Sequence, residues 1–271
     1  MKNISIILIL SLVLIMVSPL LAQKKNQITI TGSTTVLPIA QAAAEAFMDK
    51  NSVNISVRGG GSGVGVAALI NKTCTIANSS RPMKAKEITT AKSAGVNPTG
   101  YAVANDGITM VVHKTNTVKN LTIKQIKDIY TGKISNWNQV GGPNMPIVIV
   151  SRDVASGTFE VFNEKVLGGA KVIDSAMMLA SNNACATTVG DTPGAIAYIG
   201  LGYVTDKTKI VTVENVMPTV ATIKSGEYKI ARKLYMYTNG KATGDVARFL
   251  NFIFSDKGQK LVEDQGFISV K

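Results

Sequence analysis

Three segments of the chain place glycine beside serine or threonine, each where a strand-like apolar run gives way to a helix-like one. They are Gly32-Ser33-Thr34-Thr35, Gly59-Gly60-Gly61-Ser62-Gly63 and Ser156-Gly157-Thr158. Backbone amides and hydroxyls are hydrogen-bond donors without full charge, and glycine lets a ligand approach the backbone closely. These segments therefore indicate the binding of a small anion.

The physical basis for this interpretation is the amino end of a helix. The amides of the first turn have no intrahelical acceptor, and the macrodipole adds partial positive charge there. In an α/β sheet such turns gather at the carboxyl ends of the strands, so three of them could surround one oxyanion. Any one of these turns alone is more often an ordinary helix cap, and the prediction depends on the three together.

Two arginines lie close to these turns. Arg81 follows Ser80 in a serine-rich turn, and Arg152 comes four residues before Ser156. The planar guanidinium can donate to two oxygens of a tetrahedral anion at once. Both arginines are candidate ligands, with a surface ion pair as the alternative role for Arg81.

Catalytic, nucleotide and metal sites find little support. The glycine-rich turn at 59–63 matches neither GxGxxG nor a Walker A loop. Ser156 is not in a GxSxG context, and His113 is the only histidine that could serve as its base. Cys74 and Cys185 lack CxxC spacing; they are compatible with a disulfide in an exported protein or with two buried thiols. We expect no enzyme activity, no cofactor and no metal.

The amino-terminal segment has the layout of an export signal. Lys2 precedes an apolar run over residues 4–21, and Ala22 comes just before a polar segment. We expect residues 1–22 to be a signal peptide, with an uncleaved membrane anchor over 4–21 as the alternative. Either would place the protein outside the cytoplasm, in the periplasm or at the cell surface.

The formal net charge of the chain is +12. Lysine and arginine are scattered along the sequence and no aromatic residues alternate with a basic cluster, which disfavours nucleic acid as a partner. A basic surface that attracts a small anion agrees better with the polar turns.

Strand-like and helix-like segments alternate after residue 27, which predicts a parallel α/β organisation. A long apolar segment at 101–113, interrupted by Asp106-Gly107, predicts a crossover between two lobes, and 194–203 predicts the return. The chain is longer than one compact core usually requires. We expect one lobe made of 27–105 with 200–271 and a second made of 106–199.

The order of the motifs resembles a known family. The motifs are Thr31-Gly-Ser-Thr-Thr-Val, Gly59-Gly-Gly-Ser-Gly, Ser79-Ser-Arg-Pro, the run from Asp106, the segment from Leu121 to Trp137, Ser151-Arg-Asp with Ser156-Gly-Thr, and Pro193-Gly-Ala-Ile-Ala-Tyr198. Together they resemble the phosphate-binding proteins of phosphate ABC transporters, in the periplasmic-binding-protein-like class. The resemblance implies two α/β lobes joined by a hinge, with a ligand cleft between them. They would close over one inorganic phosphate and deliver it to a membrane permease.

The resemblance also implies roles for individual residues. It assigns hydrogen-bond donation to the polar turns, at Thr34, Thr35, Ser62, Ser156, Gly157 and Thr158. It assigns the main positive charge to Arg152.

One turn departs from the family's pattern. Members of the family often place an acidic acceptor in the cleft, whereas the matching turn here reads Ser80-Arg81. Asp106 is a candidate for that acceptor. Monohydrogen phosphate has a proton to donate and sulfate at neutral pH has none, so a buried carboxylate would distinguish the two anions. Without that acceptor, a sulfate-like oxyanion is an alternative ligand.

Two further function classes stay open. A surface adhesion or scaffold protein could keep the fold and lose the ligand, but Arg152 and the 156–158 turn are intact. A secreted phosphatase would need catalytic groups that the sequence does not offer. We expect a monomeric binding protein.

Overall fold

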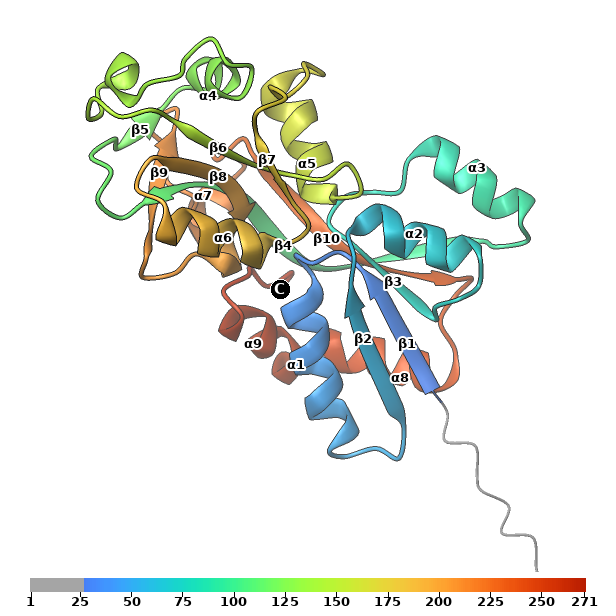
Figure 1. Ribbon diagram of the computed structural model, residues 1–271. Coiled ribbons are helices and arrows are strands. Elements are labelled where there is room, and N and C mark those ends of the chain that lie inside the picture. The colour runs from blue at the N-terminus through green and yellow to red at the C-terminus, as the bar shows by residue number, and fades with distance from the viewer. Residues whose placement is uncertain (1–26) are drawn as a thin grey trace, which may run out of the picture.

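The computed structural model describes residues 27–271, so the predicted signal peptide or anchor at 1–22 lies outside the described residues. The chain begins with three strand–helix units, as predicted (Figure 1). Strand β1 pairs in parallel with β2 on one side and with β3 on the other. The elements are β1 (Gln27–Gly32), α1 (Leu37–Met48), β2 (Asn54–Gly59), α2 (Ser62–Ile70), β3 (Ile76–Ser79) and α3 (Ala85–Ser93).

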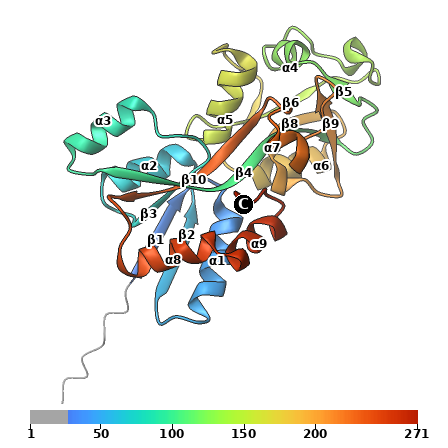
Figure 2. The ribbon, with the colours of Figure 1, turned by 180° about the vertical axis from the view of Figure 1, so that it is seen from behind.

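Two long strands connect the halves of the molecule. Strand β4 (Pro98–His113) pairs antiparallel with β10 (Ala231–Asn239) as far as Gly107, and from Ile108 onwards with β8 (Ala195–Gly200). Figure 2 shows β4 and β10 running side by side between the two lobes. The predicted crossover at 101–113 is therefore present, and the change of partner falls at Asp106-Gly107.

The second lobe continues the sheet beyond β4. Across the described residues the strand order is β2-β1-β3-β10-β4-β8-β6-β7, with β9 joining β4 and β5. Thr122 begins α4 as a capping box with Gln125, because each side chain bonds the other residue's amide. The elements here are β5 (Asn120–Leu121), α4 (Ile123–Tyr130), η1 (Trp137–Val140), β6 (Val148–Arg152), α5 (Gly157–Phe162), η2 (Asn163–Leu167), β7 (Met177–Leu179), α6 (Asn182–Asp191), η3 (Leu201–Tyr203), β9 (Thr208–Val213) and α7 (Val220–Lys224).

Separate hydrophobic cores lie under the two lobes. The first contains buried side chains of β1, β2 and α1 together with those of α8 (Gly244–Phe254) and α9 (Asp256–Asp264). The second joins Ile126 and Trp137 to Val211 and Ile223, which come later in the chain. The lobe boundary stays a proposal: because of this packing we place 208–230 with the second lobe, rather than ending that lobe at residue 199.

The two cysteines lie in different cores. Cys74 packs beneath α2, Cys185 lies on α6 and packs against β8, and both are free and buried. Of the two alternatives for this pair, the structure shows buried thiols. Among residues 27–271, no helix is long and apolar enough to cross a membrane.

Candidate functional site

The three polar turns meet where the lobes touch. Thr35, after β1, lies with its Oγ1 3.0 Å from the Oγ1 of Thr158 in the first turn of α5. The Gly63 amide at the start of α2 donates to the Ala155 carbonyl at 3.0 Å. Turns from both lobes, far apart in sequence, therefore surround one region, as the sequence predicts.

Glycine is required at the centre of this contact. A Cβ on Gly157 would lie 2.3 Å from Ser62 Oγ and 2.7 Å from Ser80 Oγ, closer than real atoms approach. The Ser80 amide donates to Ser62 Oγ at 3.0 Å, so these two serines form one wall facing α5. Ser156 caps α5 by accepting from the Phe159 amide at 3.2 Å. The amides of Gly157 and Thr158, in the first turn of α5, have no hydrogen-bond acceptor within the helix.

The hydroxyl of Thr35 has a defined direction. Its Oγ1 accepts from Asn182 Nδ2 at 2.9 Å and from Arg232 Nη2 at 3.2 Å. A hydroxyl oxygen has two lone pairs, so with both used its proton points to Thr158. Thr158 is then the acceptor of this bond and keeps its own O–H to donate. Asn182 also donates to Thr34 Oγ1 at 3.2 Å, which fixes both threonines.

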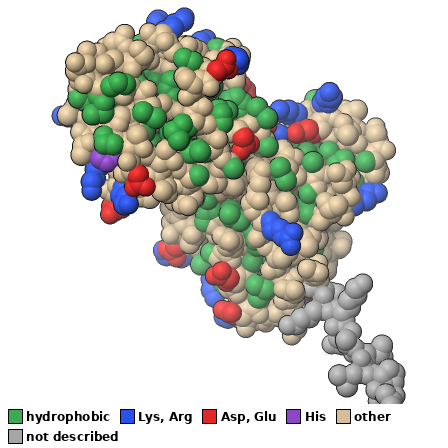
Figure 3. Space-filling view, in the orientation of Figure 1, with side chains coloured by type: hydrophobic (Ala, Val, Ile, Leu, Met, Phe, Trp, Pro, Cys, Tyr) green, Lys and Arg blue, Asp and Glu red, His purple; other side chains and the backbone are tan. Residues whose placement is uncertain are grey.

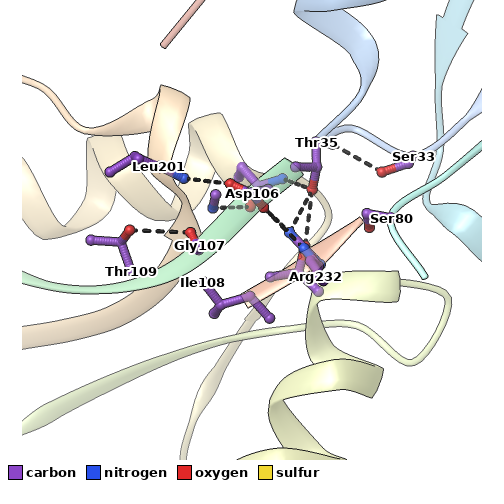
Figure 4. Close-up of polar contacts among 12 residues, drawn as sticks. Ser33, Thr35, Ser80, Asp106, Gly107, Ile108, Thr109, Leu201 and Arg232 are labelled. Atoms are coloured by element: carbon purple, nitrogen blue, oxygen red, sulfur yellow. Dashed lines mark hydrogen bonds and ion pairs between the residues drawn. The ribbon is translucent and has the colours of Figure 1, made fainter. Parts of the chain in front are cut away.

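Asp106 and Arg232 form a buried ion pair beside Thr35 (Figure 4). They are direct partners in the register of β4 and β10, so their side chains leave the same face of the sheet. Asp106 Oδ2 accepts from Arg232 Nε at 2.9 Å and Nη2 at 2.8 Å, and Oδ1 accepts from the Leu201 amide at 2.9 Å. Arg232 Nη1 is buried and has no hydrogen-bond partner among the described residues.

Burial and neighbouring charges shift the pKa values of both Asp106 and Arg232. Burial raises the pKa of the Asp106 carboxyl, while the Arg232 charge and the amides of Leu201 and Gly107 oppose the rise. Burial likewise lowers the pKa of Arg232, helped by the nearby charge of Arg152 and opposed by Asp106. Two guanidinium groups and one carboxylate thus lie within electrostatic reach of each other, which leaves an excess of positive charge at the site.

Arg152 is held rigidly at the end of β6. Its Nε donates to the Leu179 carbonyl at 3.0 Å and its Nη2 to the Ala180 carbonyl at 2.9 Å. Its backbone amide donates to Tyr198 Oη at 3.0 Å, and the residue is 1% exposed. No hydrogen bond to another residue of the 27–271 range uses Nη1, so a preoriented cation with one spare donor group lies next to the polar turns.

Arg81 takes a different position from the one that the sequence suggested. Its Nη1 and Nη2 donate to the two carboxylate oxygens of Glu87 at 2.8 and 2.7 Å, and its Nε lies 2.7 Å from Glu160 Oε2. Desolvation acts to lower the pKa of Arg81, but the bonds and charges of both glutamates outweigh it and raise the pKa. The two terminal nitrogens of Arg81 thus donate to Glu87, Nη1 donates also to the Pro82 carbonyl at 2.9 Å, and Nε forms an ion pair with Glu160. We propose that Arg81 does not bind the ligand; it forms an ion pair, as in its predicted alternative role, but this pair is buried and not on the surface.

Asp106 also differs from the expectation of a free acceptor. Its oxygens already accept from three N–H groups, the Leu201 amide and two on Arg232. A carboxylate has about four lone-pair sites, and the Gly107 amide lies close enough to act on the same group. Little capacity is left to receive a proton from a bound anion.

The sequence interpretation missed Asn182 and Arg232. Arg232 is one of five arginines in the chain, and the sequence predicted only Arg81 and Arg152, which lie in serine-rich turns, as ligands. Its partner Asp106 lies 126 positions away, and no local pattern indicates that pairing. Asn182 follows Ser181, which caps α6 by accepting from the Ala184 amide; a serine N-cap after a strand was the one available signal.

Comparison with known proteins identifies the family of this chain. A family model described as a PBP superfamily domain matches residues 20–257. The chain is 36% identical over 248 residues to the phosphate-binding protein PstS of Bacillus subtilis, covering 90% of this chain and 81% of that one. It is 32% identical over 284 residues to PstS of Borreliella burgdorferi, covering 97% and 99% of the two chains.

Solved structures give the same result. A phosphate ABC transporter substrate-binding protein from Clostridium perfringens with bound phosphate matches with a TM-score of 0.84 and 36% identity, over 91% of this chain and all of the other. A phosphate transport receptor from Vibrio cholerae matches with a TM-score of 0.73 and 30% identity, over 89% and 99%. The chain belongs to the PBP superfamily and, within it, to the family of the PstS phosphate-binding proteins.

Proposed function

We propose that this chain captures inorganic phosphate outside the cytoplasm and delivers it to the permease of an ABC importer. The observation that supports this best is the meeting of polar turns from both lobes beside two buried arginines. A small tetrahedral oxyanion can accept from donors on both sides at once. The relatives named as phosphate-binding proteins, at 36% and 32% identity, support the same ligand.

The proposed mechanism is closure around the anion. Thr34 and Ser62 contribute donors from the first lobe, and Gly157 and Thr158 from the second, where the bond from Thr35 orients the Thr158 hydroxyl. A ligand that bonds both lobes stabilises the shut form more than the open one, so it shifts the population towards closure. Arg152 supplies charge from a fixed position, and little reorganisation is needed when the anion arrives.

The occupied oxygens of Asp106 bear on selectivity. With its lone pairs engaged by Arg232 and the Leu201 amide, the proton of monohydrogen phosphate has to be accepted by a hydroxyl. Ser80 is the best candidate, because among residues 27–271 the hydrogen bond of its Oγ is with Ser62 Oγ alone, at a long 3.3 Å. A hydroxyl can also donate, so it rejects sulfate less strongly than a carboxylate does. Sulfate is for this reason the second candidate ligand.

Calorimetry on the chain from residue 23, freed of carried-over ligand by unfolding and refolding, tests the proposal. Phosphate should release heat with a single site. Arg152→Ala should weaken binding about 100-fold, because truncating a buried hydrogen-bonded charge costs about 2–5 kcal/mol. No heat with phosphate would refute the proposal, and equal affinity for sulfate would favour the second candidate.

The same variant separates a receptor from a surface adhesion or scaffold protein. Adhesion should not depend on Arg152, which is buried. On the face in Figure 3 the lysine and arginine side chains are scattered over both lobes rather than gathered in one patch. This distribution supports the proposal that the protein binds a small anion and not nucleic acid, and we propose that it is monomeric. We further propose that it turns over no phosphomonoester.

A further inference from the structure

Arg81 belongs to a cluster of four charged side chains that joins the two lobes. Arg81, Lys84 and Glu87 lie on the first lobe, between the end of β3 and the first turn of α3. Glu160 lies on α5 of the second lobe, with Oε2 2.7 Å from Arg81 Nε and 2.6 Å from Lys84 Nζ. Glu160 is thus the only member of this cluster that opening of the lobes would carry away.

The cluster is placed next to the proposed ligand site on both sides. Arg81 directly follows Ser80, which faces Gly157. Glu160 is in the same short helix as Gly157 and Thr158, one turn further along. The contacts that would hold the anion and the contacts of Glu160 are therefore carried by the same two segments, and a change in one distance between the lobes affects both.

Arg81 and Glu160 would lose different numbers of ion pairs when the lobes open. Arg81 keeps its bidentate bond to Glu87, because both belong to the first lobe. Glu160 would leave both of its cationic partners, so the pairing energy is present only in the shut form. The side chains of Arg81 and Glu160 are 5% and 16% exposed, which keeps screening by water low, while Lys84 is 57% exposed. A groove of 640 Å³ lined by these residues runs alongside and gives salt access to the cluster.

We propose that Glu160 is a positioning residue: its ion pairs with Arg81 and Lys84 hold α5 against the first lobe and slow the escape of the bound anion. This inference rests on the proposed function for its ligand, but the lobe contact itself does not. The pair forms only in the shut form. It therefore acts on the dissociation rate constant, and the association rate constant is set by encounter with the open form.

The test is Glu160→Gln, with Glu164→Gln as the matched control. Glu164 is exposed, lines the same groove and lies in the helical segment that follows, so its substitution changes the net charge equally. Stopped-flow fluorescence with inorganic phosphate should show a dissociation rate constant about tenfold higher for Glu160→Gln, with the association rate constant within about twofold. Raising the salt concentration should speed dissociation from the wild type more than from Glu160→Gln.

Equal dissociation rate constants for the two variants would overturn the inference. Should the wild type bind no phosphate, the proposed function fails, and small-angle scattering then decides on Glu160. A larger radius of gyration for Glu160→Gln than for Glu164→Gln supports its role. Identical radii overturn it.

Discussion

The buried pair of Asp106 and Arg232 allows a quantitative prediction. Asp106→Asn removes one charge and keeps the shape of the side chain. Arg232, whose side chain is 3% exposed, then stays buried without its counter-ion. We expect the variant to fold with a large loss of stability. We also expect phosphate to raise its Tm by more than it raises that of the wild type.

The magnitude follows from the contacts. Removing one partner of a buried ion pair costs about 3–5 kcal/mol, because the other charge is left uncompensated. Asparagine retains one acceptor oxygen, which can turn towards Nε and Nη2 of Arg232, so we expect the lower end, about 3 kcal/mol. In a chain of this size each kcal/mol lowers Tm by about 2–4 °C. The expected decrease in Tm is therefore about 6–12 °C.

Differential scanning calorimetry with and without phosphate is the assay. The phosphate dianion can supply part of the missing negative charge near Arg232, so phosphate should raise the Tm of Asp106→Asn by more than it raises that of the wild type. The double variant Asp106→Asn with Arg232→Met leaves no unpaired charge and should recover much of the lost stability.

Asp191→Asn is the control. Asp191 pairs with Lys207 at 3.4 Å, and both side chains are more than half exposed, so its loss should change Tm by little. Two results would show that the pair does not act through uncompensated charge. One is an Asp106→Asn variant with the same Tm as the Asp191→Asn control, and the other is a double variant less stable than the single one.

Two further predictions follow from the packing. Gly157→Ala should weaken phosphate binding by about tenfold or more, because overpacking costs about 1–3 kcal/mol and the new methyl would meet Ser62 Oγ at 2.3 Å. Gly63→Ala, whose methyl would have no neighbour closer than 3.5 Å, should bind nearly as the wild type does, and equal calorimetric affinities for both variants would contradict this. Burial raises the pKa of Cys74 to about 11 and that of Cys185 to about 12, so thiolate is scarce at pH 8. A disulfide-exchange reagent should label both thiols only after unfolding, and fast labelling of the native chain would contradict that.

The sequence alone determined the α/β alternation and the class of ligand. These features are local: Ser156 caps α5 through the amide three residues on, and Gly157 marks a close approach of the backbone. Hydrogen bonds over one helical turn depend on neighbouring residue types, so their chemistry can be read from the order of residues. The crossover strand at 101–113 was predicted for the same reason, because its length and apolar character are local properties, but β4 is not interrupted at Asp106-Gly107 and only changes its pairing partner there.

The tertiary structure decided which charges face one another. The register of β4 and β10 sets Asp106 against Arg232, and the packing of α5 against the first lobe turns Arg81 towards Glu160. Neither partner can be identified from spacing, because the separations exceed 70 residues and depend on how whole strands and helices align. A guanidinium has the same donors in a ligand site and in an ion pair, so only its neighbours in space assign its role.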